Sequence, residues 1–329
     1  MKRLFFTILF VGCIFTSCEH KELCFDHGHV RVPVSVVFDW SHAPEAAPKS
    51  MSLFLYPKGG GAPLRYEFAG RDGGMASIPI GAYDAVCVNS DTETALFRNT
   101  DRMETFEIRT DETELLPGLG IRSDEAPRAE GTETERVFAT PEPMWGARTD
   151  DVNLVLLELR AEPSDEEPQT IVLRPEEIVC HYSVEIRNVS NLQYVSAVSG
   201  SLSGMSGGVL LASNRPTPDR ATLPFATAAD SEGITGRWLT FGHCPDADDS
   251  GAGAADALKH NLVVYVLFHS GEKFYYTYDA TEKIHAAADP RHLHIVLDEG
   301  LPLPEPDKVS GGFAPSVNDW QPIYIDIIM

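Results

Sequence analysis

The chain has 329 residues, of which 43% are hydrophobic and 23% are charged, and its formal net charge at pH 7 is −23. This length is sufficient for two ordinary domains, each with a hydrophobic core of its own. A surface this acidic repels phosphate backbones, and the sequence has no basic stripe with interleaved aromatic residues, which argues against nucleic acid binding.

Residues 1–17 have the pattern of a lipoprotein signal peptide. A short basic region precedes an apolar run over residues 4–15, which is too short for a transmembrane helix of about 20 residues. Two small residues then stand directly before Cys18. This order resembles the lipobox of bacterial lipoproteins, in which the cysteine receives a lipid and becomes the new N-terminus. Cys13 is a rival acceptor with a cramped apolar region before it, and cleavage without lipidation is the other alternative.

Residues 18–29, "CEHKELCFDHGH", are predicted to be a tether beside the membrane. They also contain four residues of metal-ligating type, namely Cys24, Asp26, His27 and His29. However, there is no Cys-x-x-Cys pair and no second cluster at a recognised zinc spacing. We therefore predict neither a metal nor a cofactor.

Four cysteines follow the predicted lipid anchor, which is too few for a disulfide scaffold in a chain of this length. Cys87 lies in an apolar run, and Cys180 lies on the apolar face of an alternating segment. We expect these two to be buried free thiols, while the sequence leaves the pairing of all four open.

Alternation of apolar and polar residues with a period of two dominates the chain, as in half-buried β-strands. The clearest cases are residues 30–38, 64–68 and 178–187. Further predicted strands are 51–56, 83–88, 105–108, 153–159, 170–173, 237–241, 261–268, 273–279, 292–297 and 323–328. Short strands separated by Gly/Pro turns predict an all-β protein of antiparallel sandwiches. Only residues 91–98 and 280–289 have weak helical patterns.

The segment from residue 116 to about 151 breaks this pattern, because it is polar and rich in proline and glycine. It suggests a linker or a functional loop. A second acidic patch, which starts at residue 161, is the better candidate for a domain border. We therefore predict an N-terminal β-sandwich over residues 30–165 and a C-terminal one over 166–329.

"GMSGG", residues 204–208, matches the Gly-x-Ser-x-Gly nucleophile elbow with Ser206 as nucleophile. Hydrolases need that serine on a strand-to-helix turn, followed in the chain by an acid and a histidine. Although His243 and His260 do follow, no helical pattern does. We interpret the motif as a turn in a β-domain and predict no enzyme activity.

Two other groups admit a functional reading beside a plain one. His285, His292 and His294 could bind protons or a metal, although a solvated strand face explains them better. Three tyrosines could form a sugar-stacking surface, but packing across a hairpin explains them equally well, namely Tyr275, Tyr276 and Tyr278.

The C-terminal tail is a candidate for strand addition, in which an extended segment pairs with the free edge of a partner's sheet. After Trp320, the residues Ile323, Ile325 and Ile327 fall on one face of a predicted strand. The alternative is that this last strand pairs within its own sheet.

Several phrases together resemble the fimbrillin and fimbrial-anchor-like lipoproteins of Bacteroidia. They are "CEHKELCFDHGHV", "VVFDWS", "LFLYPKGGG", "NSDTE", "PEPMWGA", "VSNLQYVSAVSGSLSGMSGGV" and "GGFAPSVNDWQPIYIDII", spread over nearly the whole chain after the signal. The resemblance implies an outer-membrane lipoprotein with two tandem transthyretin-like β-sandwich domains and no enzyme activity. It is closest to a branch without assigned function.

Relatives in this family build or terminate surface fimbriae whose subunits join by strand insertion. The resemblance therefore implies an anchor, a tip or a minor subunit of a fimbria-like assembly at the cell surface. The alternative is a monomeric surface lipoprotein that binds a glycan or a host protein. Polymerising relatives shed an N-terminal strand at a basic site, for which Arg122, Arg128 and Arg136 are candidates here. A chain that keeps its lipid-bearing end would instead terminate or anchor the fibre.

Overall fold

The computed structural model describes residues 30–116, 119, 126–156, 168–245, 259–306 and 319–323. Regular structure in these residues is almost entirely β, as predicted. The α-helix among them is α2 (Thr281–His285), within the second predicted helical pattern. The first pattern instead contains a strand, β6 (Ala95–Arg98). None of the helices in the described part of the chain has the length and apolar character needed to span a membrane.

The first sandwich consists of two facing sheets. One has the order β10-β1-β4, built from β10 (Gln169–Leu173), β1 (Arg31–Phe38) and β4 (Gly73–Pro79). The other has the order β11-β9-β5-β2-β3, built from β11 (Glu176–Glu177), β9 (Trp145–Leu154), β5 (Gly81–Asn89), β2 (Ser50–Pro57) and β3 (Leu64–Ala69). Alternate residues of β1 are buried, so its apolar face fills the core between the sheets.

The second sandwich is one continuous, folded sheet of order β20-β12-β17-β16-β13-β18-β19-β21. Its strands are β12 (Cys180–Arg187), β13 (Val195–Ser206), β16 (Arg220–Ala229), β17 (Gly233–Thr240), β18 (Asn261–Phe268), β19 (Lys273–Asp279), β20 (His292–Leu297) and β21 (Gln321–Pro322). A short strand, β8 (Arg136–Val137), pairs with β16 outside this order.

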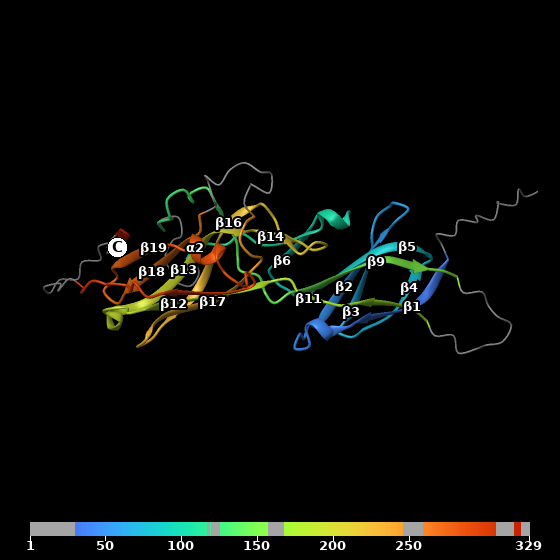
Figure 1. Ribbon diagram of the computed structural model, residues 1–329, viewed down its shortest axis with the longest axis horizontal. Helices are drawn as coiled ribbons and strands as arrows, with labels where there is room; N and C mark the ends of the chain where they lie inside the picture. The colour runs from blue at the N-terminus through green and yellow to red at the C-terminus, as the bar shows by residue number, and fades with distance from the viewer. Residues whose placement is uncertain are drawn as a thin grey trace, which may run out of the picture.

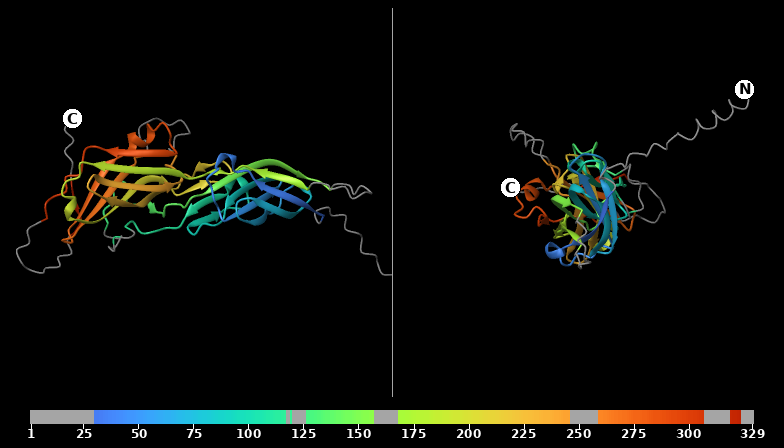
Figure 2. Two further views of the ribbon diagram at one scale, coloured as in Figure 1. Left: turned by 90° about the horizontal axis from the view of Figure 1, so that it is seen from below. Right: turned by 90° about the vertical axis from the view of Figure 1, so that its right-hand side faces the viewer.

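The two sandwiches share one topology. The order β10-β1-β4 in the first corresponds to β20-β12-β17 in the second, and β9-β5-β2-β3 corresponds to β19-β18-β13-β16. In each case the first and last strands pair in parallel, β1 with β10 and β12 with β20. The prediction of tandem β-sandwiches is therefore confirmed, and Figures 1 and 2 show the two units end to end along the long axis.

A third sheet joins the two sandwiches. It has the order β15-β14-β7-β6, where β6 and β7 (Glu107–Thr110) come from the first unit, and β14 (Gly208–Leu210) and β15 (Arg215–Pro216) come from the second. β14 pairs antiparallel with β7, with Val209 opposite Ile108. We call this the bridging sheet. Its apolar side chains pack against Phe54, Val86 and Val88 on the outer face of the first sandwich.

The domain border expected near residue 165 stays a prediction, but strand pairing favours a later position. β10 follows residue 165 and pairs with β1, and its Ile171 and Leu173 lie in the core of the first sandwich. β12, which starts at Cys180, is the first strand of the second sandwich.

The cysteines behave as expected from their strand patterns. Cys87 and Cys180 are buried and free, and so is Cys244. Burial raises the pKa of the Cys87 thiol and of the Cys180 thiol, which keeps both protonated and unreactive at neutral pH.

Phe106 gives a direct test of the bridging sheet. It is fully buried and packs edge-on against Phe54 and Phe97, with ring centroids 4.9 and 5.6 Å away. Because Phe106→Ala leaves a cavity between the sandwiches, we expect it to lower the free energy of unfolding by about 3 to 5 kcal/mol in chemical denaturation. Met75→Ala is the control, since Met75 is 60% exposed, and it should change this free energy by less than about 0.5 kcal/mol. Equal effects of the two substitutions would contradict the assignment.

Candidate strand-addition groove

The edge strand β19 is only partly covered. β21 pairs with it in parallel at Phe274 and Tyr275, and the Ile323 N–H donates a hydrogen bond of 3.1 Å to the Tyr275 carbonyl. Among the described residues, no strand covers this edge beyond Tyr275. Peptide groups of alternate residues face opposite edges of a strand, so those of Thr277 and Asp279 point to the same side as that of Tyr275. They present backbone donors and acceptors to an added strand.

A groove of about 650 Å³ follows this open edge. Its floor is the edge of β19, and β21 meets it at Pro322 and Ile323. The side chains around it are mixed in character, namely Arg128, Ala129, Glu130, Glu133, Tyr275, Thr277, Lys283, Leu297 and Glu299. Apolar surface interleaved with charges of both signs suits an extended segment that alternates apolar and polar residues.

The predicted tail residues begin at this groove. Trp320 packs edge-on against Tyr265 with ring centroids 5.4 Å apart, and the Lys273 ammonium lies 6.0 Å from the centre of its ring. Ile323 packs at the margin of the second core. Ile325 and Ile327 lie outside the described residues. Cys18 and the tether of residues 18–29 also lie outside them, so the lipid anchor stays a prediction.

One wall of the groove comes from the first half of the chain. Residues 126–138, which we call the strap, cross from the first unit onto the second, where β8 pairs in parallel with β16. Val137 and Ala129 pack against Val263 and Tyr265 on the outer face of the second sandwich. The Tyr265 hydroxyl donates a hydrogen bond of 2.8 Å to the Pro127 carbonyl. The segment predicted as a linker or loop is therefore, over residues 126–138, a packed part of the second sandwich.

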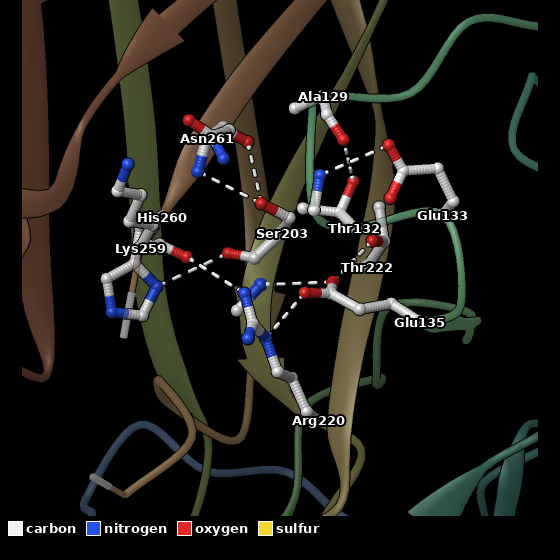
Figure 3. Close-up of polar contacts among 12 residues, drawn as sticks. Ala129, Thr132, Glu133, Glu135, Ser203, Arg220, Thr222, Lys259, His260 and Asn261 are labelled. Carbon is white, nitrogen blue, oxygen red and sulfur yellow. Dashed lines mark hydrogen bonds and ion pairs between the residues drawn. The ribbon is translucent and has the colours of Figure 1, made fainter. Parts of the chain in front are cut away.

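Glu135 fastens the strap to the sheet (Figure 3). Its Oε2 accepts hydrogen bonds from the Thr222 hydroxyl at 2.7 Å and from the Gly204 N–H at 3.2 Å. Its Oε1 lies 2.6 Å from Arg220 Nε, an ion pair that is not aligned as a hydrogen bond. The Arg128 guanidinium donates a hydrogen bond of 2.6 Å to the Glu135 carbonyl. A buried carboxylate held in this way keeps the strap in place.

The two candidate cleavage arginines that the structure describes are both engaged. Arg128 is half-buried and bonds to the strap itself, at the carbonyls of Thr132 and Glu135. Arg136 is exposed and forms an ion pair with Glu112. Arg122 lies outside the described residues.

A fully buried histidine lies beside the strap contacts. His260 Nδ1 is 3.3 Å from the Ser203 carbonyl, which requires a proton on Nδ1. Its Nε2 is then the acceptor for His285 Nε2, 2.9 Å away, and the ring of His243 lies 5.7 Å from the His260 ring. Burial lowers the pKa of His260 to about 4, and the nearby charges of His243, His285 and Arg220 lower it further.

The other sequence candidates have structural surroundings. Ser206 is buried at the end of β13, where its hydroxyl lies within hydrogen-bond distance of the Gly208 and Thr217 carbonyls. Tyr276 and Tyr278 are buried and donate hydrogen bonds to the Pro302 and Gly300 carbonyls. They therefore form no sugar-stacking surface with Tyr275, and packing within the sheet is the correct interpretation. Sequence reasoning missed Glu135, because one buried acid in an acid-rich segment gives no signal of its burial.

Comparisons with known proteins agree with this fold. A family model described as "Domain of unknown function (DUF5119)" matches residues 17–226. A candidate fimbrium anchoring subunit of Bacteroides ovatus, Fim4B, is 26% identical over 237 residues, which are 72% of this chain and 64% of that protein. The chain thus spans less than two thirds of that relative. A crystal structure of a candidate adhesin from Bacteroides ovatus has a TM-score of 0.60 at 20% identity, covering 89% of this chain and all of that chain. These matches confirm the resemblance seen in the sequence.

Removal of the Glu135 carboxylate should release the strap. We expect Glu135→Ala to lower the free energy of unfolding by about 3 kcal/mol, because it breaks a buried, hydrogen-bonded ion pair. Trypsin should then cleave after Arg128 at least tenfold faster under native conditions, as measured by mass spectrometry. The matched control is Glu133→Ala, since Glu133 is an exposed acid of the same segment. Unchanged cleavage in Glu135→Ala would contradict the role of Glu135.

His260 should make the protein sensitive to mild acid. Its pKa is lowered to about 4 in the folded chain and is about 6.5 when unfolded, so it contributes stability above pH 6.5 that is lost as the pH falls towards 4. The loss over this window is about 3 kcal/mol. His260→Gln should flatten the pH profile of the denaturation midpoint between pH 6.5 and 4.5. His269→Gln, at an exposed histidine, should leave it unchanged. Parallel profiles for wild type and His260→Gln would contradict the assignment.

Proposed function

The chain belongs to the DUF5119 family, and from this premise we propose that it is a lipid-anchored surface protein of a fimbria-like assembly. In this proposal Cys18 carries the lipid, residues 18–29 form the tether, and the chain is an anchor, a tip or a minor subunit. The names of its relatives support the assembly, because one is a candidate fimbrium anchoring subunit and another a candidate adhesin. Both names describe non-enzymatic proteins, in line with the prediction of no enzyme activity.

The observation that carries the proposal is the position of the groove relative to the N-terminal end. Residue 30, where the described chain begins, and the groove along β19 lie at opposite ends of the long axis (Figures 1 and 2). A lipid attached ahead of residue 30 would hold one end at the membrane. The open edge of β19 would then face away from it, where another subunit can reach it.

The joint that we propose is strand addition at this open edge. The backbone groups of Thr277 and Asp279 would pair with an added strand, which gives affinity without sequence specificity. The apolar side chains Tyr275 and Leu297 would receive alternate residues of that strand. The tail around Ile323, Ile325 and Ile327 has the required alternation. We propose that such a tail, from this chain or from another subunit, fills the groove.

The arginine contacts bear on whether the chain anchors or polymerises. Polymerising relatives of the resembled family lose an N-terminal strand after cleavage at a basic site. Here Arg128 bonds within the packed strap, so a protease would have to release the strap first. We therefore propose that the N-terminal, lipid-bearing end is retained and that the chain terminates or anchors the assembly.

Thr277→Pro tests the joint at one peptide group. Proline removes the N–H that faces the groove, and proline is tolerated on an edge strand when this N–H points outward. We expect tagged full-length wild type, purified from native envelopes and run unboiled, to give detergent-resistant bands that contain other β-subunits. Thr277→Pro should reduce these bands at least tenfold, whereas Thr277→Val, which keeps the N–H, should retain them.

A chain that ends at Ser316 separates the roles of the groove and the tail. If the tail is the donor strand, its loss removes the bands, and a synthetic peptide of residues 319–329 should bind to the truncated chain in fluorescence anisotropy. Folding of each variant is checked by circular dichroism. Monomers alone from wild type and every variant would refute the assembly and favour the alternative, a monomeric binder of a glycan or host protein.

A further inference from the structure

Two histidines and a glutamate meet on the surface where the sandwiches join. His181 in β12 and His292 in β20 are direct partners in the parallel pairing, and their rings stack with centroids 5.3 Å apart and planes 5° apart. Glu177 in β11 brings its Oε1 to 2.8 Å from His181 Nε2. One ligand atom from each residue lies within 4.8 Å of the others. This is a different group from the His285, His292 and His294 considered in the sequence.

A fourth residue orients one of these ligands. Asp289 Oδ2 lies 3.0 Å from His292 Nδ1, so this nitrogen carries the proton and donates it to the carboxylate. The lone pair of His292 is then on Nε2. A carboxylate that holds the second nitrogen of a histidine is the usual outer partner in zinc sites, where it fixes the ring and raises its basicity.

From this geometry we propose that Glu177, His181 and His292 bind a single divalent transition-metal ion, for which Zn²⁺ is the probe. Two imidazoles and one carboxylate are a recognised three-ligand set for zinc, with water as the fourth ligand. Imidazole ligands also select such ions over Mg²⁺ and Ca²⁺, which prefer oxygen. The three side chains are half-exposed or exposed, so an ion reaches them from solvent. This inference does not depend on the proposed fimbrial function.

The position of the ligands gives the ion a structural role. Glu177 lies in β11, which pairs with β9 of the first sandwich, opposite Trp145. The two histidines belong to the edge of the second sandwich. A bound ion would therefore cross-link the two sandwiches and hold the edge strand β20 against β12. Arg291 lies beside the site, where its guanidinium donates hydrogen bonds to the Glu177 and Val179 carbonyls. Its positive charge opposes the ion, so we expect moderate affinity.

His294 is a matched control on the same strand. It lies opposite Ser183 in the same pairing, where its Nδ1 is 2.9 Å from the Ser183 hydroxyl and its Nε2 is 3.4 Å from Glu185. It is exposed like His292, but no third ligand atom joins it and Glu185 among the described residues.

The test uses the full chain without a histidine tag, stripped of metal with a chelator and titrated with ZnCl₂ by calorimetry. We expect one Zn²⁺ per chain. His181→Ala and His292→Ala should each weaken binding at least tenfold, and Asp289→Asn should weaken it about tenfold through the loss of orientation. His294→Ala should stay within twofold of wild type. Zn²⁺ should also raise the melting temperature of wild type and of His294→Ala, but not of His181→Ala.

Three outcomes would overturn the proposal. The first is no Zn²⁺ binding by wild type. The second is equal binding by wild type and His181→Ala. The third is a loss of binding in the double variant His27→Ala/His29→Ala with none in His292→Ala, which would assign the ion to the tether.

Discussion

The pairing of β7 with β14 is the contact on which the arrangement of the two sandwiches depends. Each unit supplies one two-stranded insertion to the bridging sheet, β6 with β7 and β14 with β15. Two strands alone are marginal in water, whereas four strands with an apolar face pack stably on another sheet. Neither insertion can therefore form its structure without the other. This mutual dependence also explains why β2 and β5 carry runs of buried residues rather than strict alternation, since both of their faces are covered.

The strap adds a second connection between the units, and its contacts link the groove to the interior of the second sandwich. Glu135 accepts the Gly204 N–H, and the neighbouring Ser203 carbonyl faces His260. Protonation of His260 would place a positive charge beside the residues that hold the strap, which forms one wall of the groove. The acid sensitivity of the second sandwich and the integrity of the groove therefore have a shared structural basis.

The sequence predicts what depends on local pattern and misses what depends on register. Residues 178–187 alternate so clearly that β12 and its buried face could be predicted, and the tandem sandwiches follow from many such segments. The strap could not be identified, because its few apolar residues are spaced irregularly and Glu135 resembles its solvated neighbours. The contact of His181 with His292 was equally hidden, since it depends on which residue of β20 lies opposite β12. Likewise, the pairing of β10 with β1 could not be inferred from the acidic patch before it.

The same architecture has a mechanical consequence if the chain is held by a lipid at one end and by a partner strand at the other. Tension would then run along the long axis, from β19 through the second sandwich to the first (Figure 2). Between the sandwiches it must pass through the bridging sheet and the short link from β11 to β12. Glu177 and His181 lie on either side of that link, so an ion bound there would reinforce the connection with the fewest strands. Because a metal–ligand cross-link resists extension over a very short distance, the proposed site lies where an anchoring protein has most need of it.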